Sequence, residues 1–381
     1  MTLAQRFSRA AQDLCDALVT HGRLTALALL AEPRIPEQAL RAREMSMRME
    51  AAARIEEWLA RSFQVPPRMV AWPPDLRPDA SGIVDGSGGP VARDRLEVGR
   101  SAVLHAAAGL AASLRAMIRS EMMLDPAGPL FEAIAADLPA PAGAAPWIAK
   151  APPKAKMARA LRGPRQVALD PMFEPSFSLL DAAAARAMES HRAPRFWCLS
   201  VREVLAAELC ALSIAEHDGL PLTFYRDFAK QAWDELRHAR LFLDAALELL
   251  PELPPDHPLW PGDRLPVPRE VNVFEAIWNC SLDERLVLMH LDTEGPGVAG
   301  LPRELSNGLH LALVERLVIA AHDEVSHARL GQAWLRYLLP HRDERKARIR
   351  EALARRGMLM VAGMGNPREP LKELIGRYAR A

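Results

Sequence analysis

Apolar residues recur every three or four positions along most of this chain, which is the spacing of one buried face of an α-helix. In the first segment, 2–31, this face is made by Leu3, Phe7, Ala11, Leu14 and Leu18. The same spacing predicts further helices over 37–63, 99–124, 177–189, 194–217, 221–250, 271–294 and 309–339. No alternation of apolar and polar residues is long enough to predict a strand. The pattern therefore predicts an all-α fold.

Two stretches rich in Pro and Gly interrupt these helices. The first covers 64–98, and the second, 138–171, combines Pro and Ala with basic residues and reads as a linker. We therefore expect an N-terminal helical region over 1–137 and a main helical domain over 172–340. A C-terminal tail, 341–381, begins with the charged sequence HRDERKARIREALARR, which is typical of a solvent-exposed helix.

The composition narrows the choice of partners and compartment. Lys+Arg and Asp+Glu both number 48 in the 381 residues, so no net charge draws the molecule to nucleic acid or to an anionic membrane. The longest apolar runs, such as 24–31, are far shorter than the ~18 residues that a membrane span requires. Charged residues interrupt the N-terminal segment where a signal peptide would be apolar. We expect a cytoplasmic protein without nucleic-acid or membrane partners.

Four cysteines are spread widely along the chain, at Cys15, Cys198, Cys210 and Cys280. Their spacing contains no Cys-x-x-Cys pair, so it indicates neither a disulfide framework nor a cysteine metal site. We expect four buried, reduced thiols.

One octapeptide pattern occurs twice, as DELRHARL at 234–241 and DEVSHARL at 323–330. Residues three apart lie on nearly the same face of a helix, so Glu235 and His238 can point to one spot, as can Glu324 and His327. Carboxylate and imidazole ligands together suit iron or manganese. Di-iron and di-manganese bundles use Glu-x-x-His from each of two helices and one Glu from each of two others. Two further glutamates are therefore expected.

In an antiparallel hairpin, residues at one level are equally far from the turn. The sequence DGLP at 218–221 predicts a turn; Glu235 follows it by 235 − 221 = 14 residues, and Glu203 precedes it by 217 − 203 = 14. We therefore expect Glu203 to be a ligand. Glu208 lies five residues later and about 140° around the helix, which makes it a rival ligand or an outer-shell group.

The second hairpin is expected to turn at Asn307-Gly308. Glu324 follows this turn by 324 − 308 = 16 residues, and Glu294 precedes it by 307 − 294 = 13, so Glu294 is expected to be the fourth carboxylate ligand. Glu284 is the alternative, because the GPG sequence after Glu294 favours an earlier helix end.

Three further residues lie next to these ligands in the sequence. His290 is one turn before Glu294, and it is either an outer-shell donor or an ordinary histidine. Asp234 and Asp323 precede the ligand glutamates, and each either holds a histidine or is a solvated surface group.

Residues 194–340 resemble ferritin-like di-iron carboxylate proteins, and specifically a bacterial ferritin-like family that is catalogued as a domain of unknown function. EVLAAE at 203–208 is similar to the family's Glu-Leu-x-Ala-Ile-Glu/Asp, and DELRHARL matches its Asp-Glu-x-x-His. The third helix departs from the family, because EGPGVA at 294–299 replaces Glu-Ala-Arg-Gly-Leu-Asp. The resemblance implies a ferritin-like four-helix bundle, to which the N-terminal helical region is an addition.

A centre of four carboxylates and two histidines favours oxidised metals, so we expect two iron ions, or iron with manganese. The expected activity is O2-dependent oxidation or hydroxylation of a small organic substrate. A separate reductase is expected where the substrate supplies no electrons, since the chain has no nucleotide-binding Gly-x-Gly-x-x-Gly loop. The alternatives are a ferroxidase or a metal-stabilised binding protein. A homodimer is compatible with each.

Overall fold

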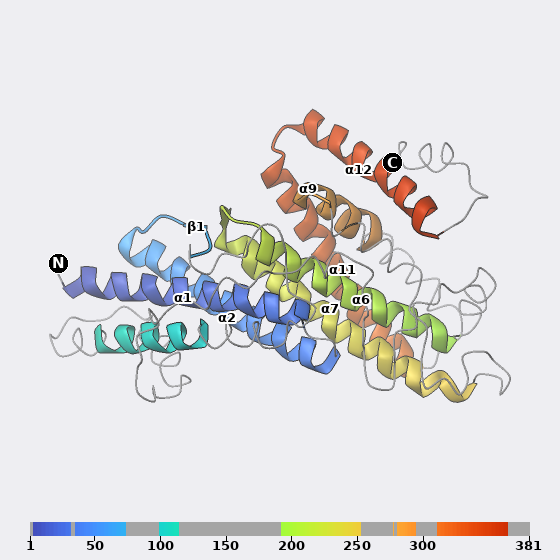
Figure 1. Ribbon diagram of the computed structural model, residues 1–381, viewed down its shortest axis with the longest axis horizontal. Coiled ribbons are helices and arrows are strands. Elements are labelled where there is room, and N and C mark those ends of the chain that lie inside the picture. Colours follow the sequence, from blue (N-terminus) through green and yellow to red (C-terminus); the bar gives the residue numbers. More distant parts are fainter. Residues whose placement is uncertain are drawn as a thin grey trace. The chain divides into compact units, whose positions relative to one another are not determined.

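The computed structural model describes residues 3–31, 35–73, 99–113, 192–252, 277, 280–294 and 311–364. These residues are almost entirely helical, so the predicted all-α class is confirmed (Figure 1). The expected linker 138–171, the expected helix 177–189 and the expected turn at Asn307-Gly308 lie outside the described residues. The chain forms two compact units, each built from separate stretches of sequence.

The first unit contains Met1–Glu32, Leu40–Leu161 and Ala211–Lys230. Its helix α1 (Leu3–Ala31) lies beside α2 (Ile35–Phe63), and a further helical stretch covers 99–113 (Figure 1). The Phe7 ring meets the edge of Trp58 with 5.4 Å between ring centroids, and the Cys15 thiol donates to the Ala52 carbonyl at 3.4 Å. The apolar face predicted for α1 is therefore its packing face.

The first unit also contains the turn between α6 (Arg192–Glu216) and α7 (Leu222–Leu249). Here β2 (Leu220–Pro221) pairs antiparallel with β1 (Met69–Val70). Gly219 has φ of +75°, a conformation that favours glycine, and its N–H donates to the Val70 carbonyl at 2.8 Å. Strands of two residues are too short to show an alternating pattern, which is why the sequence predicted none.

A buried arginine closes the end of α6. The Arg23 side chain is fully buried and donates to the carbonyls of Ile214 at 3.1 Å and His217 at 2.7 Å. It also donates to Asp218 at 2.7 Å and lies over the Trp72 ring, 4.2 Å from the centroid. The last carbonyls of a helix lack partners within the helix and carry partial negative charge, so Arg23 satisfies and neutralises the end of α6.

The second unit contains Pro33–Ala39, Arg162–Cys210 and Gln231–Ala381. Within it, the first part of α6 packs on the last part of α7: Ser200 Oγ donates to the Ala239 carbonyl at 2.8 Å, and Phe196 lies 6.1 Å from Phe242 between ring centroids. A short 3₁₀ turn, η2 (Leu250–Glu252), follows α7. Helix α11 (Leu311–Leu338) packs along η3 (Leu286–Glu294).

The third long helix, predicted over 271–294, is not one regular helix. The chain bends at Cys280, and Ser281 begins the short helix α9 (Leu282–Arg285) with a capping box in which the Glu284 carboxylate accepts from the Ser281 N–H at 3.0 Å. Residues 286–294 continue as a π-helix, η3, whose hydrogen bonds join residues five apart. The azimuths expected from α-helical geometry therefore do not hold in this segment.

Helix α12 (Arg342–Met364) was predicted to be solvent-exposed, but one side of it packs on α9 and η3. Ala352 and Leu353 are buried, and Arg355 Nη1 donates to Glu284 Oε1 at 3.0 Å. Arg348 forms an ion pair with Asp283. The charged residues of this helix therefore include specific contacts with the third-helix segment as well as a solvated face.

Three of the four cysteines, Cys15, Cys210 and Cys280, are buried free thiols, as predicted. Burial raises the pKa of Cys15 to about 12, so this thiol stays protonated. The Cys198 side chain lies outside the description. Across the described ranges, no helix has both the length and the apolar character needed to pass through a membrane.

Candidate metal centre

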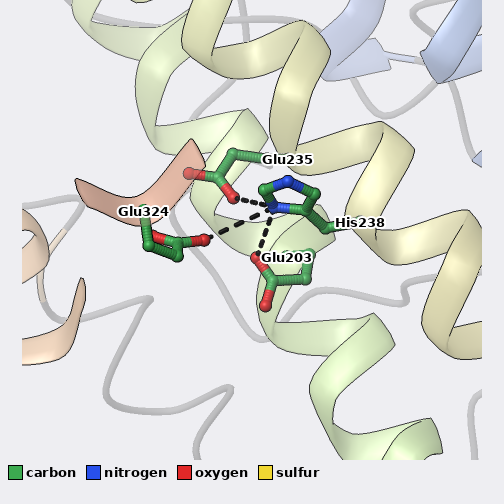
Figure 2. Close-up of side chains that lie close together, drawn as sticks. All are labelled: Glu203, Glu235, His238 and Glu324. Carbon is green, nitrogen blue, oxygen red and sulfur yellow. Dashed lines mark ion pairs between the residues drawn. The ribbon is translucent and has the colours of Figure 1, made fainter. Parts of the chain in front are cut away.

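Three helices of the second unit bring four candidate ligands together. Glu203 comes from α6, Glu235 and His238 from α7, and Glu324 from α11. Each offers one ligand atom, and these atoms all lie within 4.8 Å of one another (Figure 2). The four side chains converge because Glu235 and His238 share one face of α7, while the hairpin places Glu203 at the same level.

The two histidines lie on either side of two shared carboxylates. His238 Nδ1 is 3.5 Å from Glu235 Oε2, 3.4 Å from Glu324 Oε1 and 3.9 Å from Glu203 Oε2 (Figure 2). His327 Nδ1 is 3.2 Å from Glu235 Oε1 and 3.4 Å from Glu324 Oε2. Glu235 and Glu324 thus each turn one oxygen toward each imidazole. The two carboxylates therefore lie between the two imidazoles.

The outward nitrogen of each histidine meets an aspartate from the other repeat. His238 Nε2 lies 3.1 Å from Asp323 Oδ2, and His327 Nε2 lies 3.4 Å from Asp234 Oδ2. Arg237 Nη2 donates to Asp234 at 3.0 Å and to Asp323 at 2.6 Å. Of the two roles open from sequence, the aspartates therefore contact histidines, and the contacts direct both Nδ1 atoms inward. Arg237 was not identified from the sequence.

The inward atoms fit a metal centre. Glu235 Oε2, His238 Nδ1, Glu324 Oε2 and His327 Nδ1 are buried and have no hydrogen-bond partner within the described structure. Leaving such atoms unsatisfied costs about 1–3 kcal/mol each. Two donors bound at ~2.1 Å to one ion lie roughly 3.0–4.2 Å apart, and the nitrogen–oxygen distances here are 3.2–3.9 Å. Carboxylate oxygens with imidazole nitrogens suit iron or manganese.

The protonation of the cluster follows from burial and crowding. Burial raises the pKa of Glu203 well above its usual range, and the nearby carboxylates of Glu235 and Glu324 raise it further. Burial alone lowers the pKa of His238 and of His327, but the surrounding carboxylates outweigh it and raise both pKa values. Burial likewise raises the pKa of Glu235, yet the two imidazoles hold it well below the usual range. Without metal, the imidazoles hold protons that a cation would displace.

Of the two candidates for the third-helix ligand, the structure describes the side chain of Glu284 but not that of Glu294. The side chain of Glu294 lies outside the description, although its backbone ends η3. Glu284 is not in the cluster: its carboxylate accepts from Ser281 Oγ at 3.0 Å and from Arg355 at 3.0 Å. Burial raises the pKa of Glu284, but these partners outweigh it and lower that pKa. The alternative of Glu284 as a ligand is corrected, because the carboxylate caps α9.

Glu208 also lies outside the cluster. It is buried and accepts a hydrogen bond of 2.8 Å from Gln38 Nε2 at the start of α2, within the second unit. The equal distances from the turn predicted Glu203 rather than Glu208 as the ligand, and Glu203 is the member of this pair that lies beside the other ligands.

The described part of η3 reaches the cluster through a glutamine. His290 is buried, and its Nε2 lies 2.9 Å from Gln231 Oε1. Gln231 Nε2 in turn donates to Glu235 Oε1 at 3.0 Å. Burial lowers the pKa of His290 to about 3, so its imidazole is neutral. Gln231 was not among the predicted site residues, although its position four residues before Glu235 places it on the same helix face.

The site is thus a set of glutamates and histidines from three helices, in which Glu235, His238 and His327 are buried and Glu203 and Glu324 are partly exposed, with aspartates and a glutamine around it. No protein family, curated protein or solved structure matched this chain in the comparisons made. Its function is therefore inferred from the chemistry of these residues.

Proposed function

We propose that this protein is a ferritin-like dimetal carboxylate oxidoreductase that uses O2 to oxidise or hydroxylate a small organic substrate. The observation that carries the proposal is the sharing of Glu235 and Glu324: each turns one oxygen toward His238 Nδ1 and the other toward His327 Nδ1. Two carboxylates between two imidazoles are what a pair of adjacent metal ions requires. Iron is the proposed metal, with iron/manganese as the alternative.

The distribution of ligands over the helices supports the ferritin-like assignment. Helices α7 and α11 each supply a Glu-x-x-His pair, and α6 supplies Glu203. A ferritin-like site takes its fourth carboxylate from the remaining helix. We assign that role to Glu294, whose backbone ends η3.

The residues around the ligands prepare the site for redox chemistry. Glu203, Glu235, Glu324 and Glu294 provide four negative charges, which favour metals of higher valence. Iron, when bound, supplies the reaction with O2. The contacts of Asp323 and the matching Asp234 hold the histidine rings and raise the basicity of Nδ1. Burial shields Glu235, His238 and His327 from water and strengthens their charge interactions. Electrons come from the substrate or from a separate reductase.

Metal analysis tests the proposal directly. Protein expressed with ample iron is expected to contain close to two transition-metal ions per chain. Glu203→Ala is expected to lower this content, whereas Glu208→Ala, five residues later in the same helix, is expected to leave it near the parent value. Less than one metal ion per chain in the folded parent protein, before and after anaerobic reconstitution, would contradict the proposal.

Oxygen uptake distinguishes the proposed oxidoreductase from its alternatives. The iron-loaded protein is incubated with each member of a panel of small organic molecules. It is expected to consume O2 in proportion to the amount of substrate added. Consumption that follows only added Fe(II) would indicate a ferroxidase. A stably bound metal with no O2 consumption under either condition would indicate a structural role.

A further inference from the structure

The two oxygens of Glu235 have different surroundings. Oε1 accepts a hydrogen bond from Gln231 Nε2 at 3.0 Å and lies 3.2 Å from His327 Nδ1. Oε2 makes no hydrogen bond within the described residues and lies 3.5 Å from His238 Nδ1. Gln231 therefore fixes the rotation of this carboxylate by holding only one of its oxygens.

The orientation of Gln231 is itself fixed by His290. Because the Gln231 amide nitrogen donates to Glu235, its carbonyl oxygen faces the imidazole, and His290 Nε2 must carry the proton of the 2.9 Å contact. Both side chains are 1% exposed, so water does not compete for these bonds. The result is a buried chain of hydrogen bonds from η3 through Gln231 to Glu235.

Close packing of α11 on η3 fixes the imidazole in turn. A Cβ atom at Gly331 of α11 would lie 2.2 Å from His290 Cβ and 2.5 Å from its Cγ. Only glycine allows the two backbones to approach this closely. The position of His290 is therefore set by the backbone of α11, which also carries Glu324 and His327.

The second repeat has no equivalent of this chain. Gln231 lies four residues before Glu235, and the corresponding residue before Glu324 is Ala320, which has no side-chain donor. Glu324 Oε2, which faces His327 as Glu235 Oε2 faces His238, has no hydrogen bond among the described residues, and neither has Glu235 Oε2. The two shared carboxylates are thus held differently, although the repeats match at Asp, Glu and His.

We propose that Gln231 and His290 are positioning residues that hold Glu235 Oε1 toward His327 and thereby set the affinity of the metal position on the His327 side. This inference rests on the proposed dimetal function. The His238 position has Glu203 as a further ligand in the described structure. The oxygen of Glu235 that Gln231 holds, Oε1, is the one 3.2 Å from His327 Nδ1, whereas Oε2, toward His238, has no hydrogen bond within the described residues, so the His327 position depends more strongly on this chain.

Stepwise Mn(II) binding to the full-length metal-free protein tests the proposal. Calorimetry gives the two dissociation constants, and electron paramagnetic resonance distinguishes a single Mn(II) from a coupled pair. Gln231→Leu is expected to weaken the second step by about tenfold to a hundredfold, the usual effect of removing an outer-shell partner. The first step is expected to stay within about threefold. The spectrum of the coupled pair should then be lost at metal concentrations that fill the parent protein.

Variants at His290 separate positioning from general damage to the fold. His290→Leu is expected to weaken the second step as Gln231→Leu does, and the double variant is expected to be little worse than either, because both changes break one chain. His290→Gln replaces the imidazole N–H donor with an amide N–H donor and is expected to recover part of the affinity. Gln38→Leu, which removes a buried hydrogen bond to Glu208 instead, is the matched control and is expected to leave both steps unchanged.

Two results would overturn the inference in different ways. If the parent protein binds two Mn(II) ions and Gln231→Leu leaves both steps unchanged, or weakens both equally, the positioning chain is refuted and the dimetal function stands. If the folded parent protein binds no Mn(II) and no Fe(II), both proposals fail.

Discussion

Replacing Gly331 by Ala tests how closely α11 and η3 approach. The added Cβ would lie 2.2 Å from His290 Cβ and 3.1 Å from its Cδ2. Carbon atoms in ordinary contact are ~3.5–4.0 Å apart, so the two backbones must separate by more than about 1 Å. Because η3 is also packed on α9 and α12 and the nearest atom is the His290 Cβ, the strain cannot be relieved by rotating one flexible side chain.

Two opposing effects set the size of the change. Alanine is favoured over glycine within a helix by about 1 kcal/mol. Overpacking in a well-packed interior costs typically about 1–3 kcal/mol, and the overlap with a Cβ atom places this case at the upper end. We therefore expect Gly331→Ala to lower the free energy of unfolding by about 1–2 kcal/mol. Gly109→Ala in the 99–113 helix is the control, because a Cβ there would have no atom within 4 Å.

Thermal unfolding of the metal-free variants, followed by circular dichroism at 222 nm, measures the loss of stability expected for Gly331→Ala and the gain expected for Gly109→Ala. A change of 1 kcal/mol moves the midpoint by about 2–4 °C for a unit of 150–250 residues. Gly331→Ala is expected to lower the midpoint by about 2–8 °C, and Gly109→Ala to raise the midpoint of its own unit by about 2–4 °C. A rise for Gly331→Ala equal to that for Gly109→Ala would refute the close approach and the packing argument for His290.

Three further outcomes follow from buried charges. The pKa of His21, lowered to about 4 by burial, means that as pH falls the unfolded chain takes up a proton before the folded one does. The folded state therefore loses stability as the pH falls from about 6.5 to about 4. In urea unfolding, the free energy of unfolding of His21→Gln should fall by about 2 kcal/mol less than that of the parent between pH 8 and pH 5. Arg23→Met should cost about 3–5 kcal/mol, measured in the same way, because it leaves buried acceptors unpaired, whereas Arg54→Met at an exposed ion pair should cost under about 1 kcal/mol. Metal binding should release protons from His238 and His327, because both imidazoles are protonated in the metal-free protein. The calorimetric enthalpy of metal binding at pH 7 should therefore vary with the ionisation enthalpy of the buffer, and the metal affinity should rise with pH. Binding enthalpies that do not depend on the buffer would contradict this.

The first hairpin could be read from the sequence because its information is local. The DGLP sequence marks the turn, and the helices on both sides of it are regular. Equal numbers of residues from the turn therefore place Glu203 and Glu235 at the same height along the hairpin. The repeated Asp-Glu-x-x-His spacing also placed the histidines on the same faces as their glutamates. What the sequence left open was the partner of each aspartate, because a contact between α7 and α11 is not a local property.

The third helix could not be read in this way. Its π-helical turns and the bend at Cys280 depend on packing against α11 and α12. Counting residues back from the expected second turn assumes a regular α-helix, which this segment does not form. The Glu284 carboxylate is chemically as suitable a metal ligand as that of any other glutamate. The structure shows that it instead caps α9 and accepts a hydrogen bond from Arg355. Gln231 was missed because one amide at helical spacing is common, and its meaning depends on meeting His290.

The burial of Arg23 against the end of α6 also constrains how the chain is made. Arg23 and the Ile214 carbonyl that it binds are 191 residues apart, so a ribosome adding about 5–20 residues per second completes the second partner about 10–40 s after the first. During that interval the guanidinium has none of the α6 carbonyls to bind, and the apolar face of α1 has to be covered by other means. Helix α2 is available within the first few seconds, and its packing on α1 is the contact that can protect the nascent N-terminal segment from aggregation until α6 emerges.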